Sequence, residues 1–414
     1  MRIAIVGTGI AGLTAAHLLS RDHDLTVFEA EDRLGGHTNT VDVPWGSRTY
    51  PVDTGFIVCN EATYPNFLRL MGRLGVSLRP TEMSFSVRRE ADGLEYRPST
   101  LGTLFAQRRN LLRPHLYRIL RDLPRFKRAA RRLLDGSDTS TTLGAFVESE
   151  GLSADFRDLF LVPMGAAIWS ADPGAFADIP AAFFARFFDN HGILRVTGQP
   201  RWLTLVGGSR TYLEPLAAPF RDRVRLSCPV ESITREGEDV LVRPAGGAPE
   251  RFDHVVVAAH SDQALGMLAD PSGEERAILG AIPYQANETV LHTDTSVLPR
   301  RRKVWASWNY LVPKRPRGRV AVTYDMNILQ GLEAPAEFLV TLNPPPTLDP
   351  SRILRRMVYH HPVFTAAGTL AQARRHEISG ARRTWYCGAY WRNGFHEDGV
   401  VSALAVCEGL GAGL

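Results

Sequence analysis

The chain of 414 residues contains few cysteines, and their spacing excludes two classes of site. Cys59, Cys228, Cys387 and Cys407 are scattered and form no CxxC pair, so neither a zinc site nor a redox-active dithiol is predicted. We therefore expect no bound metal and a reducing, cytoplasmic compartment.

Long apolar runs and a strong net charge are also missing. No apolar stretch is long enough to span a bilayer, and the first predicted strand begins next to Met1, which leaves no room for a signal peptide. The net charge of +4 is mild and does not indicate nucleic-acid binding. With 44% hydrophobic and 22% charged residues, the composition is that of a soluble globular protein, and the length suits two joined domains.

What the chain does contain, within its first 36 residues, is the pattern of a strand, a glycine-rich turn, a helix and a second strand. Gly7 permits the tight turn, Gly9 lets a pyrophosphate approach the backbone, and Gly12 allows the helix to pack closely on the strand. The helix N-terminus offers unpaired N–H groups to phosphates. Glu29 follows at about the distance at which an acid accepts from a ribose hydroxyl. The pattern predicts a dinucleotide site; the alternative is a turn rich in glycine for steric reasons alone.

The continuation Glu29–Gly36 resembles the FAD-dependent amine oxidase and phytoene desaturase superfamily. The resemblance implies bound FAD, with Arg33 as a fork-shaped partner of a phosphate and the glycine pair allowing close backbone approach. We find no second GxGxxG motif, which argues against a reductase that takes electrons from NAD(P)H through its own domain. The implied fold is α/β: a Rossmann-type (GR2-like) FAD-binding domain with a mixed-sheet plus helical substrate domain.

Three later segments match the same superfamily. Pro51–Val58 would pass close to the isoalloxazine ring, although Asp53 could instead cap neighbouring residues of a turn. Val230 matches a valine whose backbone contacts the adenine end of FAD. The helix opened by Glu397–Val400 would direct its positive N-terminus at the flavin pyrimidine edge; the alternative is a plain capped helix. The residues predicted to bind FAD are Gly7, Gly9, Ile10, Ala11, Gly12, Glu29, Ala30, Arg33, Gly35, Gly36, His37, Thr38, Asp53, Thr54, Gly55, Phe56, Val230, Gly388, Asp398, Gly399 and Val400.

The resemblance covers about half of the chain and implies that the two domains interleave. We predict an FAD-binding domain made of residues 1–80, 201–270 and 381–414. The substrate domain then comprises residues 81–200 and 271–380.

Two features stand out in the substrate half. Residues 160–170 and 183–188 are strongly apolar and could line a tunnel for an apolar substrate, but ordinary core is the more common use of such segments. Residues 108–134 are the most basic part of the chain, and Pro124 is predicted to break their helix in two. This segment could touch anionic lipid as a peripheral membrane contact; a solvated helix pair is the interpretation we favour.

The resemblance implies an oxidase or desaturase in which a hydride passes from a C–H bond to the flavin. Thr54–Val58, Gly388–Trp391 and Phe395–Gly399 resemble a bacterial and plant group linked to cyclopropane- or methyl-branched fatty-acid modification. That subgroup implies a small apolar substrate, for instance a fatty-acyl chain. The electron acceptor and the oligomeric state are left open.

Two other functions remain open. An amine oxidase would need an aromatic cage, for which Tyr390, Trp391 and Trp308 are candidates, but the chain has only three lysines, so few could serve as the active-site lysine of many such enzymes. A flavin-binding partner of a lipid-modifying enzyme would need no catalysis at all. No catalytic residue is predicted, because His396 and Tyr390, which lie nearest the flavin motif, are expected to be structural.

Overall fold

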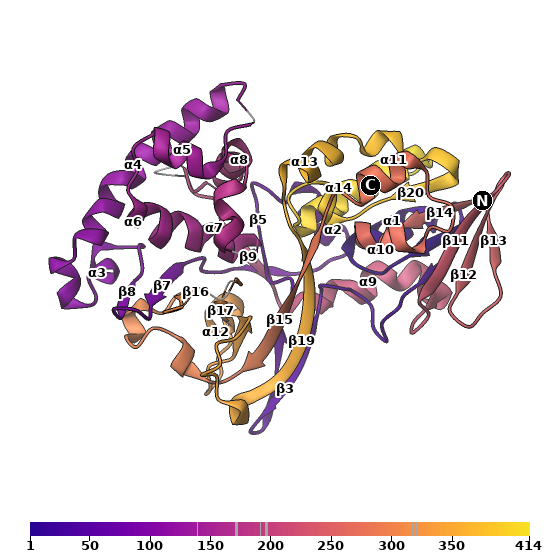
Figure 1. Ribbon diagram of the computed structural model, residues 1–414. Helices are drawn as coiled ribbons and strands as arrows, with labels where there is room; N and C mark the ends of the chain where they lie inside the picture. The colour runs from indigo at the N-terminus through magenta and orange to yellow at the C-terminus, as the bar shows by residue number, and fades with distance from the viewer. Residues whose placement is uncertain (139, 170–172, 191, 195–197, 316–317, 320) are drawn as a thin grey trace.

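A parallel sheet organises the half of the molecule that carries both chain termini (Figure 1). The computed structural model describes residues 1–414 except 139, 170–172, 191, 195–197, 316–317 and 320. Within these residues the strand order is β10-β2-β1-β14-β20, and every neighbouring pair is parallel. The strands are β1 (Arg2–Val6), β2 (Asp24–Phe28), β10 (Val224–Arg225), β14 (His254–Val257) and β20 (Thr384–Tyr386).

Both faces of this sheet are covered, because its strands are apolar on both sides. Ile3 and Ile5 belong to one core and Ala4 and Val6 to another, as the alternation of a strand requires. The first core includes residues of α1 (Ile10–Leu19), α2 (Pro65–Arg73), α9 (Leu213–Ala217) and α14 (His396–Gly409). The second includes residues of α10 (Ser261–Met267), α11 (Gly273–Leu279), α13 (Ala366–Ala373) and the small sheet of β11 (Val230–Glu236), β12 (Asp239–Pro244) and β13 (Glu250–Phe252).

A mixed sheet of seven described strands forms the floor of the other half. Its order is β19-β15-β18-β17-β16-β7-β8, and β16 pairs with β7 in parallel while the other pairs are antiparallel. The long strands β15 and β19 run from this sheet back toward the helices of the parallel sheet (Figure 1). The strands are β7 (Phe85–Arg89), β8 (Leu94–Tyr96), β15 (Tyr284–His292), β16 (Trp308–Val312), β17 (Ala321–Asp325), β18 (Leu339–Leu342) and β19 (Ile353–Pro362).

Short elements join the two halves. A hairpin follows the first glycine motifs, and a three-stranded sheet in the order β5-β9-β6 lies beyond it. These elements are β3 (Thr40–Trp45), β4 (Arg48–Asp53), β5 (Val58–Asn60), β6 (Leu78–Pro80), β9 (Trp202–Leu205) and α12 (Met326–Gln330).

A helical lobe stands on the mixed sheet (Figure 1). Its core is aromatic: the Phe126 ring lies 5.6 to 6.3 Å from the rings of Phe146, Phe156, Phe184 and Phe188. The apolar segments 160–168 and 183–188 therefore contribute mainly to core, while Ser170 and the side chain of Trp169 lie outside what the structure describes. The helices are α3 (Leu101–Leu104), α4 (Pro114–Asp135), α5 (Leu143–Ser149), α6 (Ala154–Phe156), α7 (Val162–Trp169) and α8 (Ala181–Asn190).

The prediction that Pro124 breaks the basic helix is wrong. Pro124 lies inside α4, a single helix of 22 residues in total. The ring removes the N–H that would bond to the carbonyl of Leu120. Leu120 lies on the exposed side of α4, where water can satisfy that carbonyl. Burial of Phe126 and Ala130 beyond the proline then holds the helix together.

The predicted α/β fold, with a Rossmann-type layer and a mixed-sheet plus helical half, is confirmed. The predicted domain boundaries stay predictions. In the described part of the chain, no helix combines the length and the apolar character that a membrane span needs.

Candidate functional site

In the first glycine turn, the space beside Gly9 is free of other protein atoms. Gly7 has a φ of +100°, and a methyl group at Gly12 would lie 2.0 Å from the carbonyl oxygen of Gly7, so both positions require glycine for packing. A methyl group at Gly9, in contrast, would meet no atom within 4 Å. Gly9 is the N-cap of α1 and supplies no side-chain cap to the N–H groups of the first turn, which includes Ile10 and Ala11. The turn therefore has the space and the donors that a pyrophosphate needs.

The second glycine loop lies against the first. A methyl group at Gly36 would lie 3.4 Å from the Cα atom of Gly9, and Gly35 has a φ of +110°. Arg33 donates to the carbonyls of Gly36 and Thr38 at 2.9 and 3.1 Å. The guanidinium group thus shapes this loop, and its predicted contact with a phosphate stays a prediction.

Glu29 stands at the end of β2, where a ribose is expected. It is buried and accepts hydrogen bonds from the N–H and hydroxyl groups of Thr8 at 2.8 and 2.5 Å. Val230 packs against the core that contains Phe28, so it lies beside this end of the sheet. Ala30, next to Glu29, is exposed. This arrangement is compatible with an adenosine end at β2.

The segment from Asp53 to Phe56 runs beside His37. The Phe56 N–H donates to the His37 carbonyl at 2.8 Å, and a methyl group at Gly55 would lie 2.0 Å from the same oxygen. Thr54 donates to the carbonyl of Asn39 at 3.0 Å. Gly55 therefore lets this segment approach the second glycine loop closely.

The Asp53 side chain accepts hydrogen bonds from nearby protein groups, which is the structural alternative to a flavin contact. Its carboxylate accepts from the Thr40 hydroxyl at 2.6 Å and from the N–H and hydroxyl groups of Ser209 at 2.8 to 3.0 Å. Burial raises the pKa of Asp53 to about 6. The carboxylate fixes the hairpin to the segment after β9, and a flavin contact by this side chain stays a prediction.

The last helix brings the C-terminal motif to the first one. A methyl group at Gly399 would lie 2.7 Å from Cγ2 of Ile10, so the N-terminal ends of α14 and α1 are in contact. Asp398 is buried and accepts from the N–H groups of Asn393 and Phe395 at 3.2 and 2.9 Å, which caps α14; burial raises its pKa to about 6. Both helix N-termini therefore face the glycine loops.

The other two predicted residues of this motif support the helix. The Gly388 N–H donates to the Ser402 hydroxyl at 2.8 Å, and the Val400 side chain is buried in the core shared with α1. The glycines of the four motifs, which are far apart in sequence, thus meet at one place. The open position at Gly9 and the two helix N-termini fit a dinucleotide such as FAD.

A buried cluster beside the loops joins Thr38, Phe56 and His396, which were named separately from the sequence but were not predicted to be in contact. The rings of Phe56 and His396 stack with centroids 3.6 Å apart, and Nε2 of His396 lies 3.0 Å from the Thr38 hydroxyl and 3.2 Å from the Tyr212 hydroxyl. Burial holds the pKa of His396 well below its usual value, so the ring is neutral. His396 was named from the sequence for its position in the C-terminal motif and was expected to be structural, and these contacts agree with that expectation.

A histidine cluster adjoins the same loops. His37 is one of the residues predicted to bind FAD, but its grouping with other histidines was not predicted. The His37 ring lies 6.0 Å from His260 and 5.5 Å from His361, and His260 stacks on Tyr284 at 4.5 Å. Burial lowers the pKa of His37 and His260 to about 4 and that of His361 to about 3. These residues come from three segments that are distant in sequence, so no local motif could predict that they lie together.

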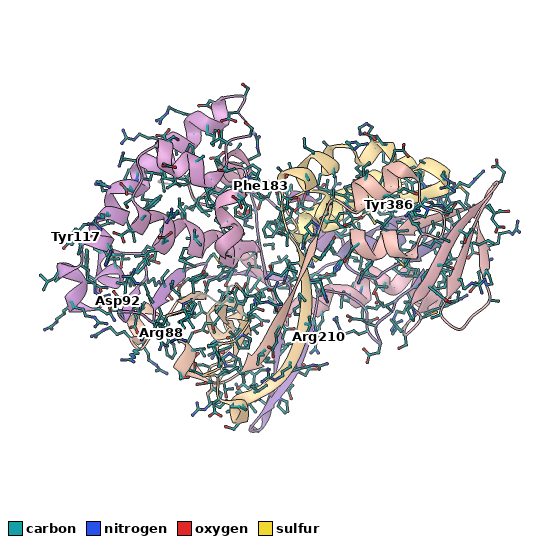
Figure 2. The ribbon with its side chains drawn as sticks, viewed as in Figure 1. Arg88, Asp92, Tyr117, Phe183, Arg210 and Tyr386 are labelled. Carbon is teal, nitrogen blue, oxygen red and sulfur yellow. The ribbon has the colours of Figure 1, made fainter. Side chains whose placement is uncertain are left out.

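An aromatic layer separates α8 from the start of α14. Phe187 and Phe395 stack with centroids 5.4 Å apart, and Phe183 and Phe364 do so at 5.3 Å. Figure 2 shows Phe183 at the junction between the helical lobe and the parallel-sheet half. Beside Phe395 is a cavity of about 350 Å³. It is lined by Ala62, Thr63, Tyr64, Pro65, Asn66, Asn190, Arg392, Asn393, Phe395, Glu397 and Asp398.

The aromatic residues considered for an amine cage are not gathered at one place. Tyr390 and Trp391 are buried in the core between the parallel sheet and α11, as their neighbour Tyr386 is (Figure 2). Trp308 lies on β16 and packs edge-on against Tyr324 at 5.1 Å. These contacts give the three candidates structural roles in two separate cores.

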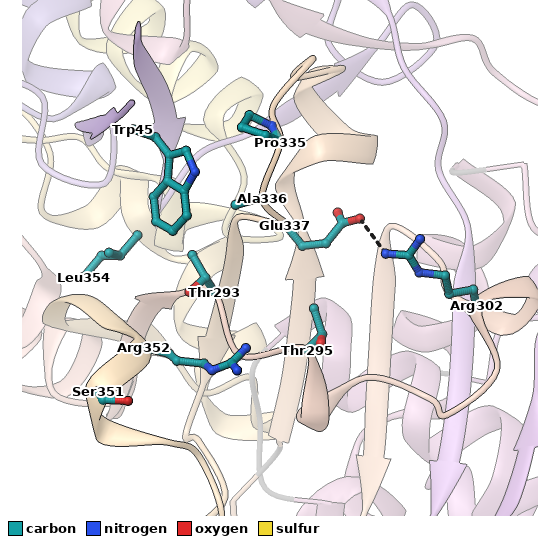
Figure 3. Close-up of a pocket in the computed structure, with 10 residues that line it drawn as sticks. All are labelled: Trp45, Thr293, Thr295, Arg302, Pro335, Ala336, Glu337, Ser351, Arg352 and Leu354. Atoms are coloured by element: carbon teal, nitrogen blue, oxygen red, sulfur yellow. Dashed lines mark ion pairs between the residues drawn. The ribbon is translucent and has the colours of Figure 1, made fainter. Parts of the chain in front are cut away.

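Figure 3 shows a second cavity, of about 520 Å³. Thr293 and Leu354 line it at one end of the β15–β19 pair, and Arg302 and Glu337 approach each other to 3.9 Å across it. His361 lies at the other end of the pair, about nine residues or 30 Å away at the rise of a strand. This cavity does not belong to the flavin site.

Comparison with known proteins decides the family. The family model described as flavin containing amine oxidoreductase matches residues 10–305, which is well over half of the chain. The chain belongs to this family. Membership confirms the predicted superfamily and FAD as the cofactor, and it agrees with the predicted class of flavin-dependent oxidoreductase.

Proteins that are similar to this chain carry different names. AofH of Mycobacterium tuberculosis, named as a flavin-containing monoamine oxidase, is 28% identical over 279 residues, which are 65% of this chain and 59% of AofH. The chain therefore spans less than two thirds of that relative. Among solved structures, the CLA-producing fatty acid isomerase from P. acnes matches with a TM-score of 0.71, 18% identity and coverage of 98% of both chains. Cyclohexylamine oxidase from Brevibacterium oxydans matches with a TM-score of 0.69, 18% identity and coverage of 99% of both chains.

Proposed function

We propose that this family member is an FAD-dependent oxidoreductase that removes a hydride from a C–H bond of an apolar substrate, namely a fatty-acyl chain. The observation that carries the proposal is the aromatic layer at the start of α14. Phe395, the N-cap of that helix, stacks on Phe187 and lines the cavity of about 350 Å³. An acyl chain lying against these rings would bring a C–H bond to the side of the site where the C-terminal motif meets the glycine loops.

The two carboxylates near this layer are already engaged. Glu397 accepts from the N–H groups of Asn66 and Phe67 at 3.2 and 2.8 Å, and Asp398 caps α14. Neither carboxylate is oriented to hold a substrate ammonium group. This supports an uncharged reacting centre.

Bound FAD would supply the chemistry, because its isoalloxazine ring accepts a hydride. The chain supplies position and environment. Phe183, Phe187 and Phe395 would hold the substrate and exclude water, and the N-terminus of α14 would favour the negative charge that develops on the cofactor. Loss of the hydride must be accompanied by loss of a proton from the neighbouring carbon, and solvent reaching the cavity beside Phe395 would accept that proton, so the scheme assigns no residue as a base.

The rival function is an amine oxidase, which the names of AofH and cyclohexylamine oxidase favour. The separated positions of Tyr390, Trp391 and Trp308 count against an aromatic cage made of these residues. A flavin-binding protein without turnover is the third candidate.

Anaerobic mixing of the FAD-loaded protein with a panel of substrates separates these functions. We expect the flavin absorbance to bleach with fatty acids or phospholipids and to stay unchanged with primary and cyclic amines. Bleaching by amines alone would establish the rival, and no bleaching by any substrate would support the non-catalytic protein. The variant Phe187→Leu should weaken acyl binding. Phe160→Leu is the matched control, because Phe160 stacks on Phe156 within the same lobe.

A further inference from the structure

Among the described residues, five of the ten exposed large apolar side chains lie at one edge of the helical lobe. Leu111 and Leu112, in a 3-10 turn before α4, are 54% and 88% exposed, and Leu101 of α3 is 68% exposed. Tyr117 and Leu120 on the first turns of α4 are 46% and 39% exposed. We call these five residues the leucine edge.

Contacts of Tyr117 connect the turn before α4 with the end of α3 within the leucine edge. The Tyr117 hydroxyl donates to the Leu111 carbonyl at 2.8 Å, and the Tyr117 ring lies 5.8 Å from that of Phe105, which follows α3. Leu120 is three residues beyond Tyr117 and so lies on the same side of the helix. Figure 2 shows Tyr117 at the outer margin of the lobe, on the side away from the parallel sheet.

Positive charge is concentrated around this patch. Residues 101–128 contain seven arginines and one lysine, whereas the whole chain has a net charge of only +4. Four of these arginines, Arg113, Arg118, Arg121 and Arg125, form ion pairs with Asp92, Asp122 or Asp155, and an excess of five positive charges remains. Arg109 donates to the carbonyl of Gly93 and Arg128 to that of Pro124, so no carboxylate among the described residues neutralises these two charges. Lys303 adds a charge beside α3, because its Nζ would lie 3.6 Å from a methyl group at Gly102.

We infer that the leucine edge is a docking surface for an anionic lipid bilayer. Leucine and tyrosine side chains would insert at the boundary between headgroups and acyl chains, while the surrounding arginines would contact lipid phosphates. An apolar patch within such a strong local positive charge matches an anionic membrane, because it offers both of the attractions that peripheral binding needs. The inference stands whichever substrate the flavin site accepts.

Vesicle flotation of the FAD-loaded protein tests this surface. We expect the protein to float with phosphatidylcholine vesicles that contain phosphatidylglycerol and to stay in solution with phosphatidylcholine alone. Binding should be lost at an ionic strength of about 1 M, where charges are screened beyond about 3 Å. The double variant Leu111→Ser, Leu112→Ser should bind about tenfold or more weakly. Leu370→Ser is the matched control, because Leu370 is 71% exposed on α13.

A second measurement does not depend on any variant. Amide hydrogen exchange of the unaltered protein should slow in residues 101–120 when phosphatidylglycerol vesicles are added and should not change with phosphatidylcholine. The inference is overturned if the protein stays in solution with anionic vesicles at low salt, or if the double variant floats as well as the unaltered protein. It is also overturned if sedimentation shows a dimer that the double variant dissociates, since the edge would then be covered by a second copy.

Discussion

Phe56 and His396 lie face to face, with ring centroids 3.6 Å apart and ring planes 11° apart. His396 also bonds to Thr38 and Tyr212, so it ties the second glycine loop to the start of α14. We expect His396→Phe to keep the stack but remove the hydrogen bonds, which should lower the free energy of unfolding by about 1–3 kcal/mol. Urea unfolding of the apoprotein measures this. An unchanged midpoint, equal to that of exposed His376→Phe, would contradict the role given to His396.

Alanine substitutions at Gly9 and Gly12 should distinguish an effect on FAD binding from an effect on folding. A methyl group at Gly9 meets no protein atom, so Gly9→Ala should leave the stability of the apoprotein unchanged while its methyl group occupies the space of the pyrophosphate. Gly12→Ala places a methyl group 2.0 Å from the Gly7 carbonyl oxygen and should destabilise the apoprotein by about 1–3 kcal/mol.

The measurement is FAD affinity by fluorescence quenching, with urea unfolding of the same samples. We expect Gly9→Ala to bind FAD at least about tenfold more weakly, which corresponds to about 1.4 kcal/mol. Normal FAD affinity in Gly9→Ala would place the pyrophosphate elsewhere.

Local motifs predicted those parts of the site that a single short segment of the chain forms. The glycine spacing at residues 7–12 and the acid at Glu29 depend on one strand–turn–helix unit, so the sequence was sufficient to predict them. The stack of Phe56 on His396 could not be predicted, because it depends on how two distant segments meet. The continuity of α4 through Pro124 was missed for a related reason: tertiary burial of Phe126 outweighs a local propensity.

Five histidines should make the apoprotein sensitive to acid. Burial lowers their pKa values below the ordinary value of about 6.5, so each takes up a proton in the unfolded chain before it does so in the folded one. The pKa values are about 4 for His37, His260 and His292, about 3 for His361, and well below the usual value for His396. Each histidine therefore lowers the free energy of unfolding by about 1.4 kcal/mol per pH unit as the pH falls below about 6.5.

Three buried carboxylates act in the opposite direction. Burial raises the pKa of Asp53 and Asp398 to about 6 and that of Asp325 to about 7, so the folded state takes up these protons first and gains stability as the pH falls toward about 4. Burial also lowers the pKa of His17 and His254, so the histidines outnumber these carboxylates, and we expect a net loss of stability as the pH falls from about 6 to 4.5.

Urea unfolding of the apoprotein across this range measures the slope. His37→Gln should reduce the slope by about 1.4 kcal/mol per pH unit, the effect of one proton. His376→Gln, at an exposed position, should not change it. A free energy of unfolding that does not vary with pH would show that these histidines are not buried in the neutral form.

Pro124 offers a stabilising substitution. Pro124→Ala restores an N–H donor for the Leu120 carbonyl in the middle of α4, and we expect the free energy of unfolding to rise by about 1–3 kcal/mol. Pro114→Ala is the control, because a proline at the first position of a helix removes no hydrogen bond. A lower thermal midpoint in Pro124→Ala would mean that the ring itself packs usefully in the lobe.

The central claim is that the protein oxidises a C–H bond of an acyl chain with its own FAD. The most direct test is an anaerobic titration of the FAD-loaded protein with a fatty acid, with the bleached flavin and the mass of the recovered lipid measured in the same sample. The account predicts one bleached flavin for each lipid molecule that has become two hydrogens lighter. A flavin that stays oxidised, or a recovered lipid of unchanged mass, would contradict it.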